Sequence, residues 1–187
     1  MSRLSLIFIL LLTGCQLLSV KPDSQVPLGT GYYQLSDSWP GPAQQLLQQA
    51  SWSDGTEQHQ FTISALLRAD VTLLVALSPL GQELWRVQYQ QGHRLSVSGI
   101  APFNQPQFAR LLLAQMQLAL LGSAQLSGRL HALKLEQDSS SRVVLDDKGN
   151  TVLQIAQPQQ LGPGQTITIT ATAYSLKITT LQQDFLP

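Results

Sequence analysis

The sequence predicts an α+β fold that is mainly β: an antiparallel, half-open β-barrel with a helical lid. Two observations carry this prediction. Apolar and polar residues alternate with a period of two across residues 57–98, and short turns interrupt the alternation. Residues 104–121 instead place apolar side chains at helical spacing, and alternating runs return after them. A meander of strands whose mouth is filled by helices satisfies this order with short connections.

The chain begins with the features of a secretory signal peptide over residues 1–14. Arg3 gives a positive start, and residues 4–12 are almost entirely apolar. This run is far shorter than the roughly 20 residues of a membrane-spanning helix. The sequence Leu12-Thr13-Gly14-Cys15 resembles the bacterial lipobox, in which the cysteine thiol receives a diacylglycerol. The alternative is an ordinary signal peptide with an incidental cysteine.

The lipobox resemblance implies a mature lipoprotein that begins at Cys15. Gln16 takes the place of the aspartate that retains such lipoproteins in the inner membrane, so the resemblance implies anchoring in the outer membrane, facing the periplasm. Cys15 is the only cysteine, so no intramolecular disulfide forms. Residues 15–38 contain Pro22, Pro27, Gly29 and Gly31 and predict a flexible linker. A single domain is expected over residues 39–187.

The first elements of this domain are a short helix and a four-strand meander. Leu46, Leu47 and Ala50 give residues 43–50 one apolar side, which predicts a helix. Strands follow over residues 57–68, 71–77, 83–89 and 94–98. The strand at residues 71–77 is apolar on both faces, so it is expected to be covered on both sides.

A longer helix and further strands complete the chain. Asn104 is positioned as an N-cap before Pro106, and the apolar stripe runs to Gly122. Residues 123–130 form either a second short helix or a lead into a strand. Runs at 142–145 and 151–155 flank a hairpin turn, and alternating threonines start the last pair of strands at residue 166.

The sequence contains little that points to catalysis. The three histidines, His59, His93 and His131, have no partner at metal-ligand spacing, so neither a metal nor another cofactor is predicted. Asp146-Asp147 suits a hairpin turn better than a catalytic pair. Lysine and arginine balance aspartate and glutamate, so nothing indicates nucleic-acid binding. The protein is predicted not to be an enzyme, with a lipid-modifying enzyme kept as the lesser alternative.

The segment from Val75 to Leu84, with its Pro79-Leu80-Gly81 turn, resembles the strand–turn–strand of the LolB family, outer-membrane lipoprotein receptors of Gram-negative bacteria. The resemblance is sharpest over residues 61–95. The helix at 107–121 and the closing residues 174–181 look even more like LolB-like lipoproteins encoded with aryl polyene pigment clusters. The resemblance implies a LolA/LolB-like half-barrel with helices as a lid over an apolar cavity for acyl chains.

The resemblance also implies a function. The protein would bind an acyl chain or similar amphiphile and help insert it into the outer membrane, with a LolA-like periplasmic carrier as a possible partner. The cargo stays open: a lipoprotein acyl group, an aryl polyene lipid or another amphiphile. The alternative function is a structural or adaptor lipoprotein that docks a partner in the cell envelope.

Two groups of residues are candidates for the site. The turn Pro79-Leu80-Gly81 would pass acyl groups to the membrane, as the resemblance implies for its leucine. The apolar cavity would be lined from the strands and the helix, although the same side chains equally well fill an ordinary core: Phe61, Ile63, Leu73, Val75, Trp85, Val87, Leu112 and Met116.

Overall fold

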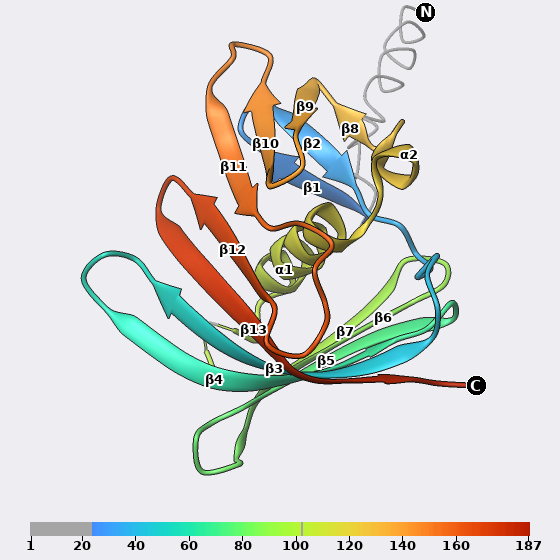
Figure 1. Ribbon diagram of the computed structural model, residues 1–187, viewed down its shortest axis with the longest axis vertical. Coiled ribbons are helices and arrows are strands. Elements are labelled where there is room, and N and C mark those ends of the chain that lie inside the picture. Colours follow the sequence, from blue (N-terminus) through green and yellow to red (C-terminus); the bar gives the residue numbers. More distant parts are fainter. Residues whose placement is uncertain (1–23, 102) are drawn as a thin grey trace, which may run out of the picture.

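A large curved sheet and one helix in its concavity make up most of the molecule (Figure 1). The computed structural model describes residues 24–101 and 103–187, so the predicted signal peptide and Cys15 lie outside the described residues. All pairings in the large sheet are antiparallel, in the order β7-β6-β5-β4-β3-β13-β12-β11-β10-β9, and a smaller sheet has the order β1-β2-β8.

The elements have the following bounds. The strands are β1 Gln25–Leu28, β2 Gly31–Gln34, β3 Gln44–Ser53, β4 Gln58–Leu67, β5 Val71–Leu77, β6 Glu83–Gln90, β7 Arg94–Gly99, β8 Leu130–His131, β9 Leu133–Gln137, β10 Ser141–Asp146, β11 Thr151–Ala156, β12 Thr166–Ala171 and β13 Tyr174–Phe185. The helices are α1 Pro106–Leu120 and α2 Ser123–Leu126.

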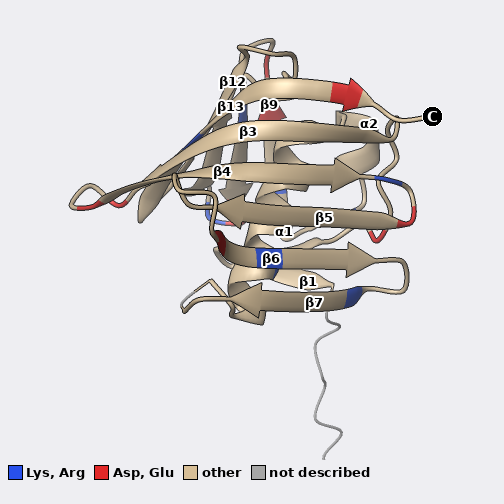
Figure 2. Ribbon diagram, turned by 90° about the horizontal axis from the view of Figure 1, so that it is seen from below, with Lys and Arg blue, Asp and Glu red and all other residues tan. Residues whose placement is uncertain are grey.

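The structure is mainly β with few helices, as predicted, but its large sheet is not closed into a barrel. Among the described residues, β7 and β9 are the two edges of the sheet and do not pair with each other. The meander of β4, β5, β6 and β7 is confirmed, and Figure 2 shows its strands as one layer with α1 behind them. Every second residue of these strands faces inward, which is what the alternation predicts.

The helix predicted over residues 43–50 is wrong, because this segment forms most of β3. Leu46 and Ala50 are buried on the inner face, whereas Leu47 is 37% exposed on the other. A spacing of four residues fits one side of a helix and one face of a strand equally well. Pairing with β4 on one side and β13 on the other decides the conformation, since it satisfies the backbone groups of β3 along both edges.

The flexible linker predicted over residues 15–38 is wrong for residues 25–34, which form the hairpin of β1 and β2. Val26, Tyr33 and Leu35 from this region are buried in the core, so the ordered domain begins well before residue 39. The glycines serve the hairpin instead of loosening it. Gly29 has φ +56, and a Cβ on Gly31 would lie 2.3 Å from the carbonyl oxygen of His131 in β8.

The longer helix is confirmed as α1, with Pro106 in its first turn. Its N-cap is Gln105 instead of Asn104, and no side chain caps it. The chain leaves α1 at Leu121 in an extended conformation, so Gly122 precedes α2 instead of ending α1. Of the two possibilities for residues 123–130, the short helix is the one formed, and β8 follows it.

Candidate ligand-binding cleft

The strand residues predicted to line a cavity fall on two faces of the sheet. Ile63 pairs with Ala76 and Ala76 with Trp85, so these side chains share the inner face with Phe61 and Val87. Leu73 and Val75 are assigned wrongly: they lie on the outer face, while Thr72, Leu74 and Ala76 of the same strand are buried. Because β5 is apolar on both faces, its alternation does not reveal which face meets the helix.

The inner-face residues of β4 and β6 belong to a packed aromatic core. Trp85 contacts Phe61 and Phe108 edge to face, with ring centroids 6.3 Å and 6.1 Å apart. Phe108 contacts Phe103 in the same way at 5.2 Å. Ile63, Trp85 and Val87 are each at most 4% exposed. This end of the concavity is therefore filled by side chains. Here the predicted cavity residues form part of an ordinary hydrophobic core, which was the alternative to a cavity.

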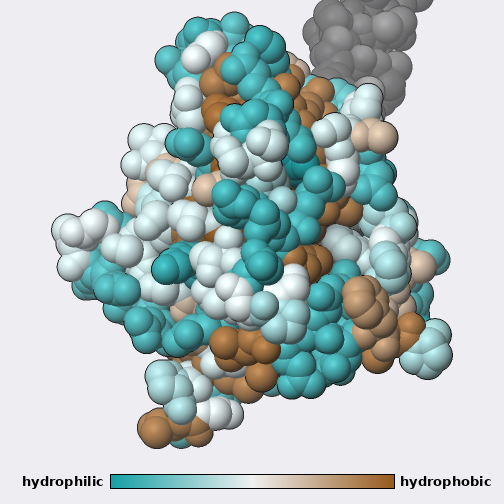
Figure 3. All heavy atoms as spheres, in the orientation of Figure 1, coloured by the Kyte–Doolittle hydropathy of each residue, from teal (hydrophilic) through white to brown (hydrophobic). Residues whose placement is uncertain are grey.

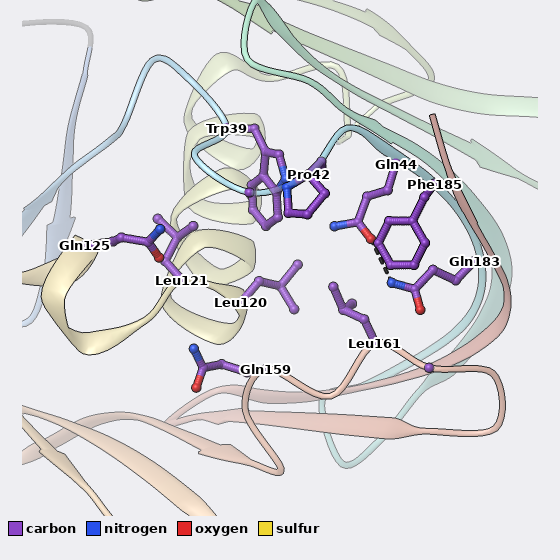
Figure 4. Close-up of a pocket in the computed structure, with 12 residues that line it drawn as sticks. Trp39, Pro42, Gln44, Leu120, Leu121, Gln125, Gln159, Leu161, Gln183 and Phe185 are labelled. Atoms are coloured by element: carbon purple, nitrogen blue, oxygen red, sulfur yellow. Dashed lines mark hydrogen bonds between the residues drawn. The ribbon is translucent and has the colours of Figure 1, made fainter. Parts of the chain in front are cut away.

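The other end of the concavity opens into a cleft of about 430 Å³, which we call the mouth (Figure 4). It lies between the C-terminal end of α1, the segment before β3, the end of β13 and the loop after β11. In Figure 4, Leu120 and Leu161 project toward its centre from opposite sides. The residues that line it are Trp39, Gly41, Pro42, Gln44, Leu120, Leu121, Gln125, Gln159, Leu161, Gly162, Gln183 and Phe185.

Behind the mouth, a narrow space of about 40 Å³ separates α1 from β3, β12 and β13; we call it the apolar strip. Leu120 lines both spaces, so the strip begins where the mouth ends. Leu112 and Met116, both predicted to line the cavity, face the strip. The other lining residues are Gln48, Gln115, Ala119, Leu120, Ile167, Ile169, Leu176 and Ile178.

Sequence reasoning missed the isoleucines of β12 and the apolar residues of β13 as lining residues. Ile167 and Ile169 alternate with threonines, and both are buried. That alternation predicts a strand but does not say which element the strand faces. The pairing of β13 with β3 brings these strands under α1, and residues as distant in sequence as Gln44 and Phe185 become neighbours.

Glutamines supply most of the polar groups around the cleft. Gln183 Nε2 donates a hydrogen bond of 2.8 Å to Gln44 Oε1, and Gln48 Nε2 donates one of 3.2 Å to the Thr180 hydroxyl. Gln115 Nε2 donates to the Tyr174 hydroxyl, and burial raises the pKa of Tyr174. A buried amide with a partner keeps the cleft polar without a charge.

The C-terminal half of α1 is fastened on the side away from the strip. Gln117 Oε1 accepts hydrogen bonds from the Tyr33 hydroxyl (3.1 Å) and the Ser36 amide (2.8 Å), and its Nε2 donates to the Ser36 carbonyl. Burial raises the pKa of Tyr33, which keeps this hydroxyl protonated and able to donate. Arg142 Nη1 donates to the Leu118 carbonyl.

The predicted membrane-transfer turn is exposed. Pro79, Leu80 and Gly81 all project from the sheet between β5 and β6, and Leu80 is 88% exposed. The Ser78 hydroxyl accepts hydrogen bonds from the Leu80 and Gln82 amides, both at 3.2 Å, and shapes the turn. Figure 3 shows the apolar tip of this turn standing away from the body of the molecule.

The histidines each have an ordinary structural neighbour. His131 stacks on Tyr32 with 4.4 Å between ring centroids, His93 Nδ1 lies 2.7 Å from the Tyr89 hydroxyl, and His59 packs against Trp52. Within residues 24–101 and 103–187, no three histidine, cysteine or acidic side chains are grouped as metal ligands. No helix in this part of the chain has the length and hydrophobicity needed to cross a membrane.

The model of the family described as "Protein of unknown function (DUF3261)" matches residues 45–182, which is most of the chain. The chain belongs to the DUF3261 family. The match runs from β3 to β13, so it includes α1 and both walls of the apolar strip in this DUF3261 protein. A search of the curated proteins finds none that matches the chain.

Three solved structures show limited similarity to this DUF3261 protein. A LolA superfamily protein from Nitrosomonas europaea is 6% identical with a TM-score of 0.46, over 80% of this chain and 89% of that one. A DUF1329 family protein from Desulfovibrio piger is 9% identical with a TM-score of 0.38, over 78% of this chain and 86% of that one. An outer membrane lipoprotein-sorting protein domain from Vibrio parahaemolyticus is 11% identical with a TM-score of 0.32, over the same shares. At these scores, none of the three identifies a ligand for this chain.

Proposed function

We propose that this protein is an outer-membrane lipoprotein that binds the acyl chain of an amphiphile in the cleft and helps to transfer it into the membrane. The observation that carries the proposal is that the mouth adjoins the apolar strip, with Leu120 lining both. The mouth has a volume of about 430 Å³, which is within the ordinary range of small-molecule sites. The strip behind it is lined mainly by isoleucine, leucine and methionine side chains, which suit a hydrocarbon tail, together with Ala119, Gln48 and Gln115.

Entry of a tail requires the strip to widen. About 40 Å³ is close to the volume that one or two water molecules occupy, far less than an acyl chain needs. The helix side of the strip carries Leu112, Met116 and Leu120, and a methionine side chain adapts easily to a new neighbour. The hydrogen bonds of Gln117 hold the opposite side of α1. Therefore α1 acts as the lid, pivoting on its fastened side.

The exposed turn at Leu80 supports the transfer step. Inserting one leucine into a bilayer gains only about 1.5–3 kcal/mol, which is too little to anchor a protein. In this proposal the diacylglycerol on Cys15 provides the anchor, and Leu80 only brings the cleft-bearing domain to the membrane surface during delivery.

Photo-crosslinking in the protein's own host tests the binding site. Cells would produce the protein with p-benzoylphenylalanine in place of Met116, which lines the strip, or in place of Leu73 on the outer face as the control. Trypsin then releases residues 111–129 or 69–86, which keeps the reacted position apart from any lipid on Cys15. An acyl adduct on the Met116 peptide and little on the Leu73 peptide is the expected result.

Two other results contradict the proposal. Equal acyl adducts at both positions would show that the strip does not bind lipid preferentially. A crosslink from Met116 to another protein, without an acyl adduct, would favour the alternative of an adaptor lipoprotein that docks an envelope partner.

A further inference from the structure

We infer that the mouth holds the polar end of the ligand and selects an uncharged, carbonyl-bearing group, such as an acylglycerol ester or an acyl amide, over carboxylates, phosphates and amines. This inference rests on the proposed function, because it assigns the head group of the same ligand. The chemistry of the mouth carries it. All twelve residues that line the mouth are uncharged, and four of them are glutamines.

The side-chain amide of Gln44 is the polar group of the mouth that indicates most about the ligand. Gln44 is only 3% exposed, and its Oε1 is occupied by the hydrogen bond from Gln183. Its Nε2 makes no hydrogen bond within the described part of the chain and points into the mouth in Figure 4. This N–H faces the open mouth instead of being sealed in the core, so it can donate a hydrogen bond to an acceptor that enters the mouth. A ligand carbonyl oxygen supplies that acceptor.

Gln159 and Gln125 border the mouth on the side away from Gln44. Gln159 has φ +65, a left-handed conformation that residues with a Cβ seldom adopt. The backbone N–H of Gln159 donates a hydrogen bond of 2.9 Å to the Ala119 carbonyl, so this loop is fastened to the last turn of α1. The Gln159 side-chain amide makes no hydrogen bond among the described residues, which leaves it available as both a donor and an acceptor.

A charged head group lacks a counterion in this mouth. Taking an ionised group out of water is unfavourable unless a charge of the opposite sign pairs with it. Arg142 is a buried cation near the end of α1, but its guanidinium donates to Gln137 and the Leu118 carbonyl, and it does not line the mouth. An ammonium head has a second disadvantage, because it has no acceptor to offer Gln44 Nε2.

Head-group selectivity is testable with probes that share one oleoyl chain. The processed protein with p-benzoylphenylalanine at position 116, held in amphipol, would be titrated with 1-oleoylglycerol, oleoylglycinamide, oleate, 1-oleoyl lysophosphatidate and oleylamine. The crosslink yield on residues 111–129 gives the half-saturating concentration of each probe. The two uncharged probes are expected to saturate at concentrations at least ~10-fold lower than the three charged ones, since a tenfold difference needs only a modest fraction of the cost of burying an unpaired charge. A difference between the ester and the amide identifies the preferred carbonyl group.

A variant with a charge in the mouth sharpens the test. Gln159→Lys should improve oleate and lysophosphatidate binding by at least ~10-fold, because it supplies the missing counterion. The matched control, Gln154→Lys, places the same charge on an exposed residue of β11 that does not line the mouth, and should leave all five probes unchanged.

The outcomes separate this inference from the proposed function. If all five probes bind equally well, or if Gln159→Lys has no more effect than Gln154→Lys, the head-group inference is overturned while lipid binding stands. If no probe crosslinks at position 116, the proposed function fails, and the inference fails with it.

Discussion

Arg142 is fully buried, yet none of the hydrogen bonds of its guanidinium goes to a carboxylate. Nε and Nη2 donate to Gln137 Oε1 at 3.0 Å and 2.8 Å, and Nη1 donates to the Leu118 carbonyl in the last turn of α1. Burial lowers its pKa, and the negative end of the helix dipole favours a cation at this point. Arg142 therefore ties the β9–β10 hairpin to the end of the lid helix.

Arg142→Met should destabilise the protein by roughly 1–3 kcal/mol, because it leaves the buried Leu118 carbonyl without the donor that Arg142 supplies. Urea unfolding followed by circular dichroism measures the change. The control is Arg86→Met, which removes an exposed ion pair with Glu83 (2.6 Å) and should cost less than about 1 kcal/mol. Equal losses in both variants would show that Arg142 has no special structural role.

Leu80→Glu should leave the free energy of unfolding within about 0.5 kcal/mol of the wild-type value, as for a typical surface substitution. The side chain is 88% exposed, so the folded state loses almost no buried surface. If the turn acts on lipid, the same variant should deliver less bound amphiphile to vesicles. A large loss of stability, or unchanged delivery, would count against a role for Leu80 in transfer.

At the scale of elements, aspartates organise three hairpins of the large sheet. Asp54 accepts backbone N–H groups in the β3–β4 turn, Asp138 in the β9–β10 turn, and Asp146 in the β10–β11 turn. These hydrogen bonds stabilise the ionised carboxylates. Backbone donors at Glu57 and Thr56 hold the pKa of Asp54 at about 2, and donors at Ser140 and Ser141 do the same for Asp138. The turn interpretation of Asp146 agrees with this pattern.

Stability should therefore fall when these carboxylates become protonated. A pKa that is lower in the folded than in the unfolded state adds stability above the unfolded pKa of about 4. That contribution is lost as the pH falls from about 4 to about 2. The triple variant Asp54→Asn, Asp138→Asn and Asp146→Asn should show a flatter loss of thermal stability between pH 5 and pH 2. Parallel curves for variant and wild type would refute the assignment.

The β1–β2 hairpin depends on one close backbone approach. Gly31→Ala should destabilise the protein by roughly 1–3 kcal/mol, because the new methyl group would overlap the His131 carbonyl oxygen. Gly162→Ala is the matched control, since its nearest neighbour would lie at 3.6 Å, an ordinary contact. Chemical denaturation compares the two. Similar denaturation midpoints for the two variants would mean that the hairpin accommodates the new methyl group without loss of stability.

At the scale of the whole molecule, β3 joins the two halves of the sheet. It pairs with β4, its neighbour in sequence, and with β13 at the far end of the chain. The concavity, the mouth and the strip all depend on that second pairing. Charged residues are few throughout: they make up only 12% of the sequence, and Figure 2 shows few of them along the strands.

The proposed function requires Cys15 to carry the lipid that anchors the domain to the membrane. Radiolabelled palmitate fed to cells should label the wild-type protein and leave Cys15→Ala unlabelled, because the thiol is the only nucleophile of its kind in the chain. Gel autoradiography after immunoprecipitation gives the answer. Equal labelling of both proteins would rule out Cys15 as the attachment site.

The sequence alone predicted the class of fold, the meander and the long helix, because these depend on local periodicity. The alternation across residues 57–98 and the proline in the first turn of α1 act over a few residues, and the structure agrees with both. Leu112 and Met116, which the sequence predicted to line a cavity, lie on the side of α1 that faces the apolar strip.

Only the tertiary structure decided which faces meet. Leu46 and Ala50 suit a helix or a strand, and the pairing of β3 with β13 selects the strand. Leu73 and Val75 are as apolar as their buried neighbours in β5, and register alone turns them outward. The mouth combines Trp39, Gln159 and Phe185, which are far apart in sequence. Long-range pairing brings them together, and no local pattern encodes that.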